Sequence, residues 1–370
     1  MVETGVSYFS SRDLRHVRAD LEEMVAHGCT YVVHCFTETD LLYYRATMGE
    51  IMQATRDAGL EAWVDPWGVA AIFSGETLSR FLVNHPEALQ VRSDGRRSPA
   101  ACPNHPETRR FLLDWVAAAA EAGGQVAFWD EPHFDIPLWR GDWSGAWACR
   151  CQHCQERFRD FAGGAMPERM DDQVRAFRER SLIDLLAELS TAARKQGMRN
   201  CLCLLPVDPG AVGLTELAER QEQRLRERMQ SAGGSPADDE PWRSAGIRDW
   251  DAAAGIADLD VFGTDPYWYL ARAEPEPYVR AFTKRTVETA RRHGIDDVQI
   301  WVQAFGVPEG REEELALGLR VAVEEGATHL AAWSYRGTET MAIRCARPEV
   351  AWQIVGETFR ELRGMRQPPS

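Results

Sequence analysis

The sequence predicts an α/β protein that folds as a single (β/α)8 TIM barrel. Its 370 residues have ordinary globular composition, with 44% hydrophobic and 27% charged residues. Short runs rich in β-branched and aromatic residues alternate with longer amphipathic runs. Eight strand-like runs occur in this way, which is the number that a closed parallel barrel needs. A doubly wound sheet is the alternative, but its usual glycine fingerprint is absent.

The elements follow one another in a regular order along the chain. The strand-like runs are residues 6–9, 30–36, 61–64, 125–129, 199–205, 260–263, 299–305 and 329–335. The helix-like runs between them include residues 13–27, 40–58, 106–122, 173–196, 278–293 and 312–325. A glycine follows each of these helix-like runs, which is typical of a helix C-terminus.

Three connections after strands are long. They follow the third, fourth and fifth strands and cover residues 68–105, 132–148 and 206–250. All three are expected on the C-terminal face of the barrel, where such folds carry their active sites. The last contains a helix-like run, 214–229, which predicts either a lid or a solvated excursion. We expect residues 1–370 to form one catalytic domain, with 207–250 as that excursion.

The charge balance excludes several classes of partner. Forty-two Lys and Arg residues against 57 Asp and Glu residues give a net charge of −15. The basic residues do not cluster, so a nucleic-acid partner is not expected. No run approaches 18 apolar residues, so a membrane span is not expected either. The first residues have no basic region typical of a signal peptide, which favours the cytoplasm, and the sequence leaves the oligomeric state open.

Four of the nine cysteines are spaced as metal ligands. A C-x-C-x2-C motif lets three thiolates converge from one tight turn, and a further cysteine ends the preceding long connection. The predicted ligands are Cys102, Cys149, Cys151 and Cys154. Four thiolates without an open position predict a structural zinc site. A cluster of reduced thiols is the alternative, and His105 and His153 could replace a missing ligand.

The cysteine motif belongs to a wider resemblance. Residues 90–97, leading to Cys102-Pro103-Asn104-His105-Pro106, resemble the third loop of the family 42 β-galactosidases of glycoside hydrolase clan A. In that family, one cysteine there joins a C-x-C-x2-C motif to hold a zinc ion. Residues 260–268 and 331–337 also resemble its barrel. The resemblance implies a glycosidase barrel, but the family's later domains, including its trimerisation domain, have no counterpart here, so trimer assembly is not carried over.

Hydrolysis of a glycoside needs two carboxyl groups that face the scissile bond. The fourth strand ends in Asp130 and Glu131, which places Glu131 at the barrel mouth. In the resembling family this strand ends in Asn-Glu, and the resemblance therefore implies that Glu131 is the general acid. Asp130 stands where the family has an Asn that binds the sugar. An ionised Asp cannot donate a hydrogen bond, so the sugar contact there must differ.

The second carboxylate departs from the family pattern. The family's nucleophile follows the seventh strand, where this sequence has Gln303. An amide cannot form the glycosyl ester, which leaves an inverting enzyme with its base elsewhere, a variant altered at this position, or a sugar-binding protein without catalysis. Asp265, after the sixth strand, is the leading replacement base, with Asp65 and Glu38 behind it. Inversion requires carboxyl groups about 6.5–9.5 Å apart.

Thirteen tryptophans are available, and most lie at predicted strand ends or in the loops that follow. Sugar rings pack well on indole faces, while acids and amides around them bind the hydroxyl groups. The candidate substrate-binding residues are Asp65, Trp67, Asp130, Trp268, Trp301, Trp333, Tyr335 and Arg336.

These observations predict a glycoside hydrolase that acts on a small glycoside or oligosaccharide, with Glu131 as acid and a structural zinc ion. A catalytically silent carbohydrate-binding barrel is the first alternative. A divalent-metal sugar isomerase is the second, with His34, Glu131, His133 and Asp265 as metal ligands.

Overall fold

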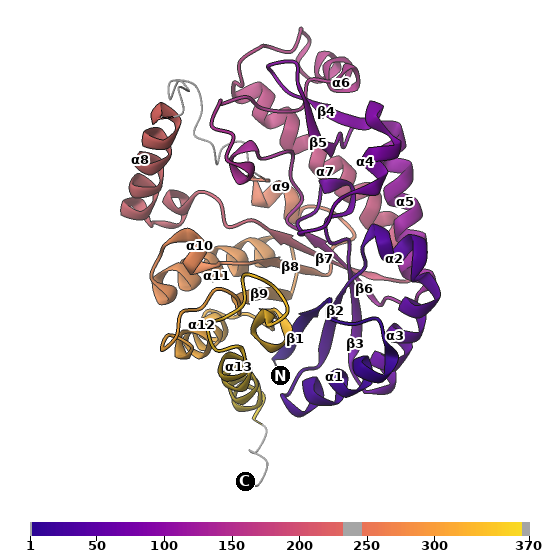
Figure 1. The fold of residues 1–370 in the computed structure, drawn as a ribbon. Helices are drawn as coiled ribbons and strands as arrows, with labels where there is room; N and C mark the ends of the chain where they lie inside the picture. The colour runs from indigo at the N-terminus through magenta and orange to yellow at the C-terminus, as the bar shows by residue number, and fades with distance from the viewer. Residues whose placement is uncertain (1, 232–245, 365–370) are drawn as a thin grey trace.

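A computed structural model describes residues 2–231 and 246–364 of the chain. Eight parallel strands close into a barrel, with helices packed around it (Figure 1). The barrel strands in chain order are β1 (Glu3–Tyr8), β2 (Tyr31–Cys35), β3 (Glu61–Asp65), β6 (Val126–Asp130), β7 (Arg199–Leu204), β8 (Val261–Thr264), β9 (Asp297–Gln303) and β10 (His329–Trp333). The predicted TIM barrel is therefore confirmed, and each predicted strand overlaps an observed one.

The first and last strands close the barrel. In β1, Glu3 aligns with His329 of β10, and Gly5 aligns with Tyr31 of β2. Gly5 has no side chain because the ring of Tyr31 occupies the place of its Cβ, with a ring carbon 2.3 Å from that position. Larger aromatic side chains fill the barrel interior. They are Tyr31, Trp63, Phe128, Trp301 and Trp333.

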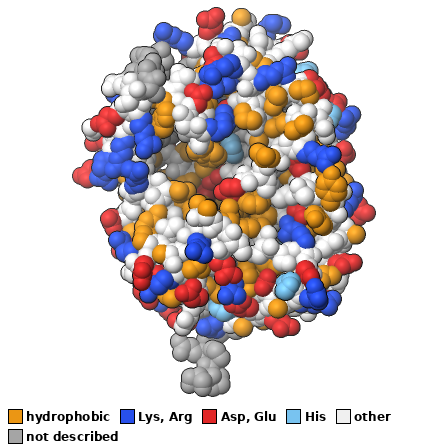
Figure 2. Space-filling model, in the orientation of Figure 1, with side chains coloured by type: hydrophobic (Ala, Val, Ile, Leu, Met, Phe, Trp, Pro, Cys, Tyr) orange, Lys and Arg blue, Asp and Glu red, His pale blue; other side chains and the backbone are white. Residues whose placement is uncertain are grey.

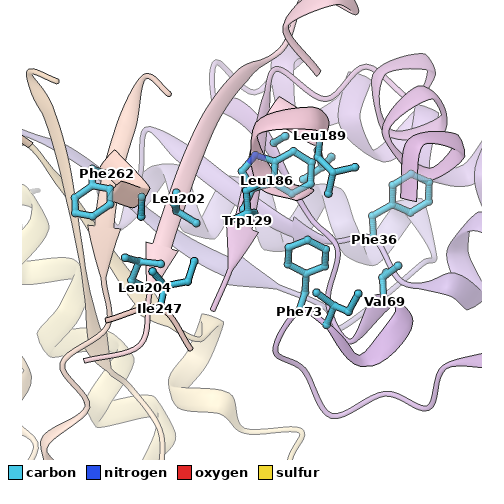
Figure 3. Packing of buried hydrophobic residues seen from close by; sticks show 14 of the residues in the cluster. Phe36, Val69, Phe73, Trp129, Leu186, Leu189, Leu202, Leu204, Ile247 and Phe262 are labelled. Carbon is cyan, nitrogen blue, oxygen red and sulfur yellow. The ribbon is translucent and has the colours of Figure 1, made fainter. Parts of the chain in front are cut away.

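Helices cover the outside of the barrel and bury its apolar outer face. The principal helices are α1 (Leu14–Ala26), α2 (Glu38–Tyr43), α3 (Arg45–Asp57), α5 (Pro106–Glu121), α7 (Asp172–Lys195), α11 (Pro275–Arg292), α12 (Glu313–Glu324) and α13 (Pro348–Leu362). Figure 3 shows Trp129 of β6 pointing into this layer, beside Leu186 and Leu189 of α7. The indole N–H of Trp129 donates to Asn200 over 3.1 Å, which satisfies its one polar atom.

One predicted helix differs from the observed structure. Residues 40–58 were expected to form a single helix, but α2 and α3 meet at Tyr44, whose φ and ψ of −123° and 19° are not helical. A capping box at the start of α2 explains why helical structure begins earlier than predicted. Thr37 accepts a hydrogen bond from the Asp40 N–H, and the Asp40 carboxylate accepts one from the Thr37 N–H, so a short helix begins before the predicted one.

The three long connections carry structure of their own. The first holds α4 (Arg80–Asn84) and a hairpin of β4 (Leu89–Val91) and β5 (Arg97–Ala101), and the second leads to α6 (Gln152–Ala162). The third holds α8 (Thr215–Ser231) and α9 (Trp250–Ala254), and α10 (Trp268–Ala271) follows β8.

The helix predicted at 214–229 is confirmed as α8, while residues 232–245 of the predicted excursion lie outside the described residues. Figure 1 shows α8 standing off the barrel wall near α10, and Gln221 of α8 donates to the Ala271 carbonyl over 3.0 Å. Across residues 2–231 and 246–364, every helix is too short or too polar to span a membrane.

Candidate active site

Carboxyl groups gather at the C-terminal end of the barrel. Asp65 ends β3, Asp130 ends β6, Glu131 follows Asp130, and Asp265 follows β8. Because all barrel strands are parallel, their last residues meet at one face of the fold. Asp65 and Asp265 are buried, with 0% and 3% of their surface exposed. The barrel therefore places four acidic residues around one mouth.

Glu131 is held by its backbone and by a neighbouring loop. Its φ is +41°, a left-handed conformation that is costly for a residue with a side chain and that is often found at functional sites. Its N–H donates to the Cys203 carbonyl of β7 over 3.0 Å, which keeps the turn against the barrel. The hydroxyl of Ser74, from the connection after β3, donates to its carboxylate.

Asp265 and Glu131 form a carboxyl pair whose side chains lie within hydrogen-bonding reach of each other, an arrangement that favours one proton between the two groups. Burial raises the pKa of Asp265 well above its usual range, and the negative charge of Glu131 raises it further. Within the described residues, Asp265 Oδ1 has no hydrogen-bond partner. Burial of both the carboxyl pair and this oxygen therefore favours a form of the pair that holds one proton.

The remaining mouth carboxyl groups are perturbed in the same direction. Burial raises the pKa of Asp65 and of Asp130, and their neighbouring carboxylates add to the effect. The Cys35 thiol donates to Asp65 over 3.7 Å. Glu76, in the connection after β3, also has a pKa raised by burial and by Glu131. Glu76 and Ser74 were not predicted, because their loop carries no periodic pattern that places it over the barrel mouth.

A cavity of about 620 Å³ opens beside the carboxyl pair. Glu131, Asp265, Tyr267 and Tyr278 line its barrel side. Trp139, Trp143 and one face of α8 line the opposite side, and Figure 2 shows a hollow next to this helix. The volume falls in the range of sites that bind small molecules, about 300–1,000 Å³.

Gln303 lies at the end of β9, as expected for the nucleophile position, but its side chain is occupied. Its amide oxygen accepts a hydrogen bond from the Tyr269 N–H over 3.0 Å. Its amide nitrogen donates to the Phe305 carbonyl over 3.2 Å. The side chain is buried and ties two loops together, and it does not line the cavity.

Three predicted substrate-binding tryptophans belong to an aromatic column in the barrel. Trp67 stacks on Phe9 with ring centroids 5.0 Å apart, and Trp333 lies 6.1 Å from Trp67 and 6.0 Å from Trp301. Trp67 and Trp333 each keep 8% of their surface exposed, whereas Trp301 keeps 1%. The column packs the barrel interior up to the mouth, and its members are not among the residues that line the 620 Å³ cavity.

Three other predicted substrate-binding residues lie away from the carboxyl pair. The indole of Trp268 donates to Glu314 of α12 over 3.1 Å. The Tyr335 hydroxyl donates to Asp20 of α1 over 3.0 Å, and Arg336 pairs with Glu339 over 3.1 Å. Each side chain points into the helix layer or pairs on the surface, and the structure corrects our placement of these three at the mouth.

Two more candidates have structural partners. The Glu38 carboxylate accepts hydrogen bonds from the N–H groups of Ala70 and Phe81, and so ties down the loop after β3. His34, a proposed metal ligand, contacts Thr55 at 2.8 Å on the outer side of β2. Burial lowers its pKa to about 3, so this imidazole is neutral.

The four predicted cysteine ligands lie together. The sulfur atoms of Cys102, Cys149, Cys151 and Cys154 are all buried and all within 4.8 Å of one another. Tetrahedral coordination with metal–sulfur bonds of about 2.3 Å would place sulfurs about 3.8 Å apart. In the described part of the chain, this is the one group of three or more His, Cys, Asp or Glu side chains that could hold a metal ion.

The surroundings of the cysteines suit thiolate ligands. The N–H groups of Val91 and Cys151 each donate to Cys149 over 3.4 Å, and the Asn104 side chain donates to Cys154 over 3.3 Å. His105 accepts a hydrogen bond from the Glu107 N–H and so caps α5. The cluster has four cysteine sulfurs and needs no histidine as a substitute ligand. The proposed isomerase ligands form no such group among the described residues.

Solved structures resemble this barrel over nearly its whole length. A β-galactosidase from Bacillus circulans sp. alkalophilus aligns with 98% of the chain, at a TM-score of 0.66 and 12% identity. An endo-1,4-β-mannanase from Rhizomucor miehei aligns with 98% of the chain at 0.60 and 9%, and one from Thermotoga petrophila with 99% at 0.56 and 10%. The chain covers 56%, 95% and 78% of these three proteins respectively.

At such low identity these similarities establish the fold alone, and the fold is one that glycosidases use. The chain spans little more than half of the β-galactosidase, so that enzyme's activity is not carried over as a finding. No protein-family model matches the sequence, and no curated protein matches it.

Proposed function

We propose that this protein is a glycoside hydrolase that acts on a small glycoside or oligosaccharide. One observation carries the proposal: Glu131 and Asp265 form a hydrogen-bonded carboxyl pair on the wall of the cavity at the barrel mouth. Hydrolysis of a glycoside needs two such groups, one of which carries a proton. The fold that this chain shares with a β-galactosidase and two mannanases supports the same class of reaction.

In the proposed reaction, Glu131 is the general acid. The proton shared by the pair passes to the glycosidic oxygen through Glu131, the bond from that oxygen to the anomeric carbon breaks, and the aglycone leaves as an alcohol. Asp265, now ionised, forms an ester with the anomeric carbon. Glu131 then takes a proton from water, which attacks the anomeric carbon and releases Asp265. Ser74 donates to the Glu131 carboxylate and so orients it.

This route retains the anomeric configuration, whereas the sequence had suggested an inverting enzyme. Inversion needs carboxyl groups about 6.5–9.5 Å apart, with a water molecule between them and the sugar. Retention needs about 5 Å. A hydrogen-bonded pair must open much further for inversion, so retention requires the smaller movement.

The test is a comparison of leaving groups. Glu131→Gln should lose turnover of an aryl glycoside whose phenol is a poor leaving group. It should keep most of the first step on a dinitrophenyl glycoside, because dinitrophenolate leaves without protonation. Asp265→Asn should lose both, because the nucleophile is gone. The reverse pattern would exchange the two roles, and full activity in both variants would refute the proposal.

A silent carbohydrate-binding barrel is the second candidate, and Gln303 is the observation that favours it. An amide stands at the family's nucleophile position and is engaged by the backbone on both sides. Calorimetry that detects sugar binding, together with no product from any glycoside tested, would favour this candidate.

The family 42 resemblance extends the proposal to the cysteine cluster. Cys102, Cys149, Cys151 and Cys154 would hold a structural zinc ion, because four thiolates leave no coordination position open for catalysis. The ion would fix the connections after β3 and β6, which carry Ser74 and Glu131. The proposal places the protein in the cytoplasm, where thiols stay reduced, and all nine cysteines are unpaired within the described structure.

The proposal takes residues 1–370 as one catalytic domain. Helix α8, from the excursion predicted at 207–250, would act as a cover over the substrate, since it lines the cavity that the carboxyl pair faces.

A further inference from the structure

The side of the cavity opposite the carboxyl pair is basic. Arg224 and Arg228 of α8 and Arg272, at the end of α10, all line it. We call these three residues the arginine wall. Figure 2 shows Lys and Arg side chains gathered over α8, beside the hollow, in a protein whose net charge is −15. The cavity thus has carboxyl groups on one side and guanidinium groups on the other.

The two faces of α8 use their arginines differently. On the outer face, Arg226 forms an ion pair with Glu222. On the cavity face, Arg224 and Arg228 form no ion pair with any residue that the structure describes. They are four positions apart, a spacing at which like charges repel and destabilise a helix. Local helix stability therefore does not explain Arg224, whereas Arg228 lies in the last turn of α8, where the helix dipole favours a cation.

The acidic side chains on this side form no ion pair with the arginine wall among the residues that the structure describes. Glu227 also lines the cavity, and its carboxylate accepts a hydrogen bond from Gln223 over 3.0 Å. Asp208 lines it as well and forms an ion pair with Arg248. Arg228 lies over the ring of Trp143, 5.4 Å from its centroid, and this contact holds the guanidinium at the cavity.

We propose, on the basis of the glycosidase function above, that the substrate carries an anionic group that the arginine wall binds. Guanidinium groups match carboxylate, sulfate and phosphate groups in a planar, two-pronged geometry. The carboxyl pair repels an anion, so the charged part of the substrate lies toward α8 and the scissile bond toward Glu131. The arginine wall selects acidic saccharides and also sets their direction in the cavity.

The experiment compares a neutral aryl disaccharide with counterparts whose second sugar is a uronic acid, a sulfate ester or a phosphate ester. For the wild type, at least one anionic substrate should have a kcat/KM roughly tenfold higher than the neutral one, mainly through a lower KM. Salt near 0.5 M, where the Debye length is only about 4–5 Å, should reduce this ratio. The substrate that benefits identifies the anionic group.

The double substitution Arg224→Gln and Arg228→Gln should bring the ratio close to one. Arg226→Gln is the matched control, because it removes the same charge from the outer face of the same helix and should keep both the ratio and the activity. Circular dichroism would verify that all variants fold. A wild-type ratio near one, or a preference that survives the double substitution, would overturn the proposal.

Failure here can be told apart from failure of the proposed function. If the neutral disaccharide is hydrolysed, and Glu131→Gln prevents this, but no anionic preference exists, then the glycosidase function stands and the arginine wall is not a specificity site. If no glycoside is hydrolysed, calorimetry with the same disaccharides still tests the wall. Tighter binding of an anionic disaccharide, lost in the double variant, would support it, and equal binding would refute it.

Discussion

The side chains of Asp265 and Glu131 lie within hydrogen-bonding reach of each other, although the two residues follow different barrel strands, β8 and β6. They meet because parallel strands end at one face of the barrel. Two acids so close cannot both be ionised at low cost, so the pair retains a proton.

The first prediction concerns pH. Burial and the charge of Glu131 raise the pKa of Asp265, and the proposed reaction needs the pair to hold one proton. We expect kcat/KM to fall as pH rises through this raised pKa, and the fall to lie well above pH 4, where an ordinary Asp titrates. A pH–rate profile of the wild type measures it. A profile that is flat from pH 5 to about 10 would contradict the role of the pair.

The second prediction concerns stability. Asp65 is buried with a raised pKa, so the folded protein favours its neutral form and loses stability as pH rises above the unfolded-state pKa near 4. Asp65→Asn removes this cost. We expect the variant to exceed the wild type in free energy of unfolding by roughly 1 kcal/mol or more at pH 7, and to show little gain at pH 4.

Denaturant unfolding at both pH values makes that comparison. Asp57→Asn is the control, since Asp57 lies exposed at the end of α3. An equal effect of Asp65→Asn at the two pH values would contradict the assignment of a buried carboxyl group.

The third prediction concerns the metal. Wild-type protein should contain one zinc ion, and Cys151→Ser should release it and lower the melting temperature by roughly 5–10 °C. Elemental analysis and a thermal melt provide the two readouts. Cys345→Ser, at a buried cysteine outside the cluster, should keep the metal. Metal-free wild type, or full zinc content in Cys151→Ser, would contradict the site.

The fourth prediction concerns Gln303. If this position were a lost nucleophile, Gln303→Glu would restore activity. We expect no gain in activity, because the side chain lies outside the cavity. We also expect the free energy of unfolding to fall by about 1–3 kcal/mol, because the new carboxylate would face the Phe305 carbonyl without a proton to donate. Gln353→Glu, on the exposed face of α13, is the control. A rise in kcat would favour the interpretation that this protein is a variant enzyme altered at the nucleophile position.

The fold could be predicted because the strands contain short apolar runs and each predicted helix-like run is followed by a glycine. The cysteine cluster could be predicted because three of its members lie within six residues of one another. Helix boundaries were less accessible, since the start of α2 depends on capping contacts of Thr37 and the break at Tyr44 is marked by no glycine or proline.

The site was predicted only in part, and the tryptophans show why. Trp129 occurs in a strand that is apolar up to its last residue, so the sequence has no alternation there to say which face its side chain takes. The structure turns Trp129 toward α7 and Trp301 into the barrel. Ser74 and the arginines of α8 come from long connections, whose path over the mouth depends on tertiary contacts.

The most direct test of the account is to trap the reaction on the enzyme. A fluorinated aryl glycoside, in which the fluorine slows the second step, should leave one sugar covalently attached, and peptide mass spectrometry should locate the ester on Asp265. Glu131→Gln should still become labelled when the leaving group is dinitrophenol. A sugar attached to a different carboxylate, or a turned-over natural glycoside whose product shows the inverted anomer, would contradict the proposed pairing of Glu131 with Asp265.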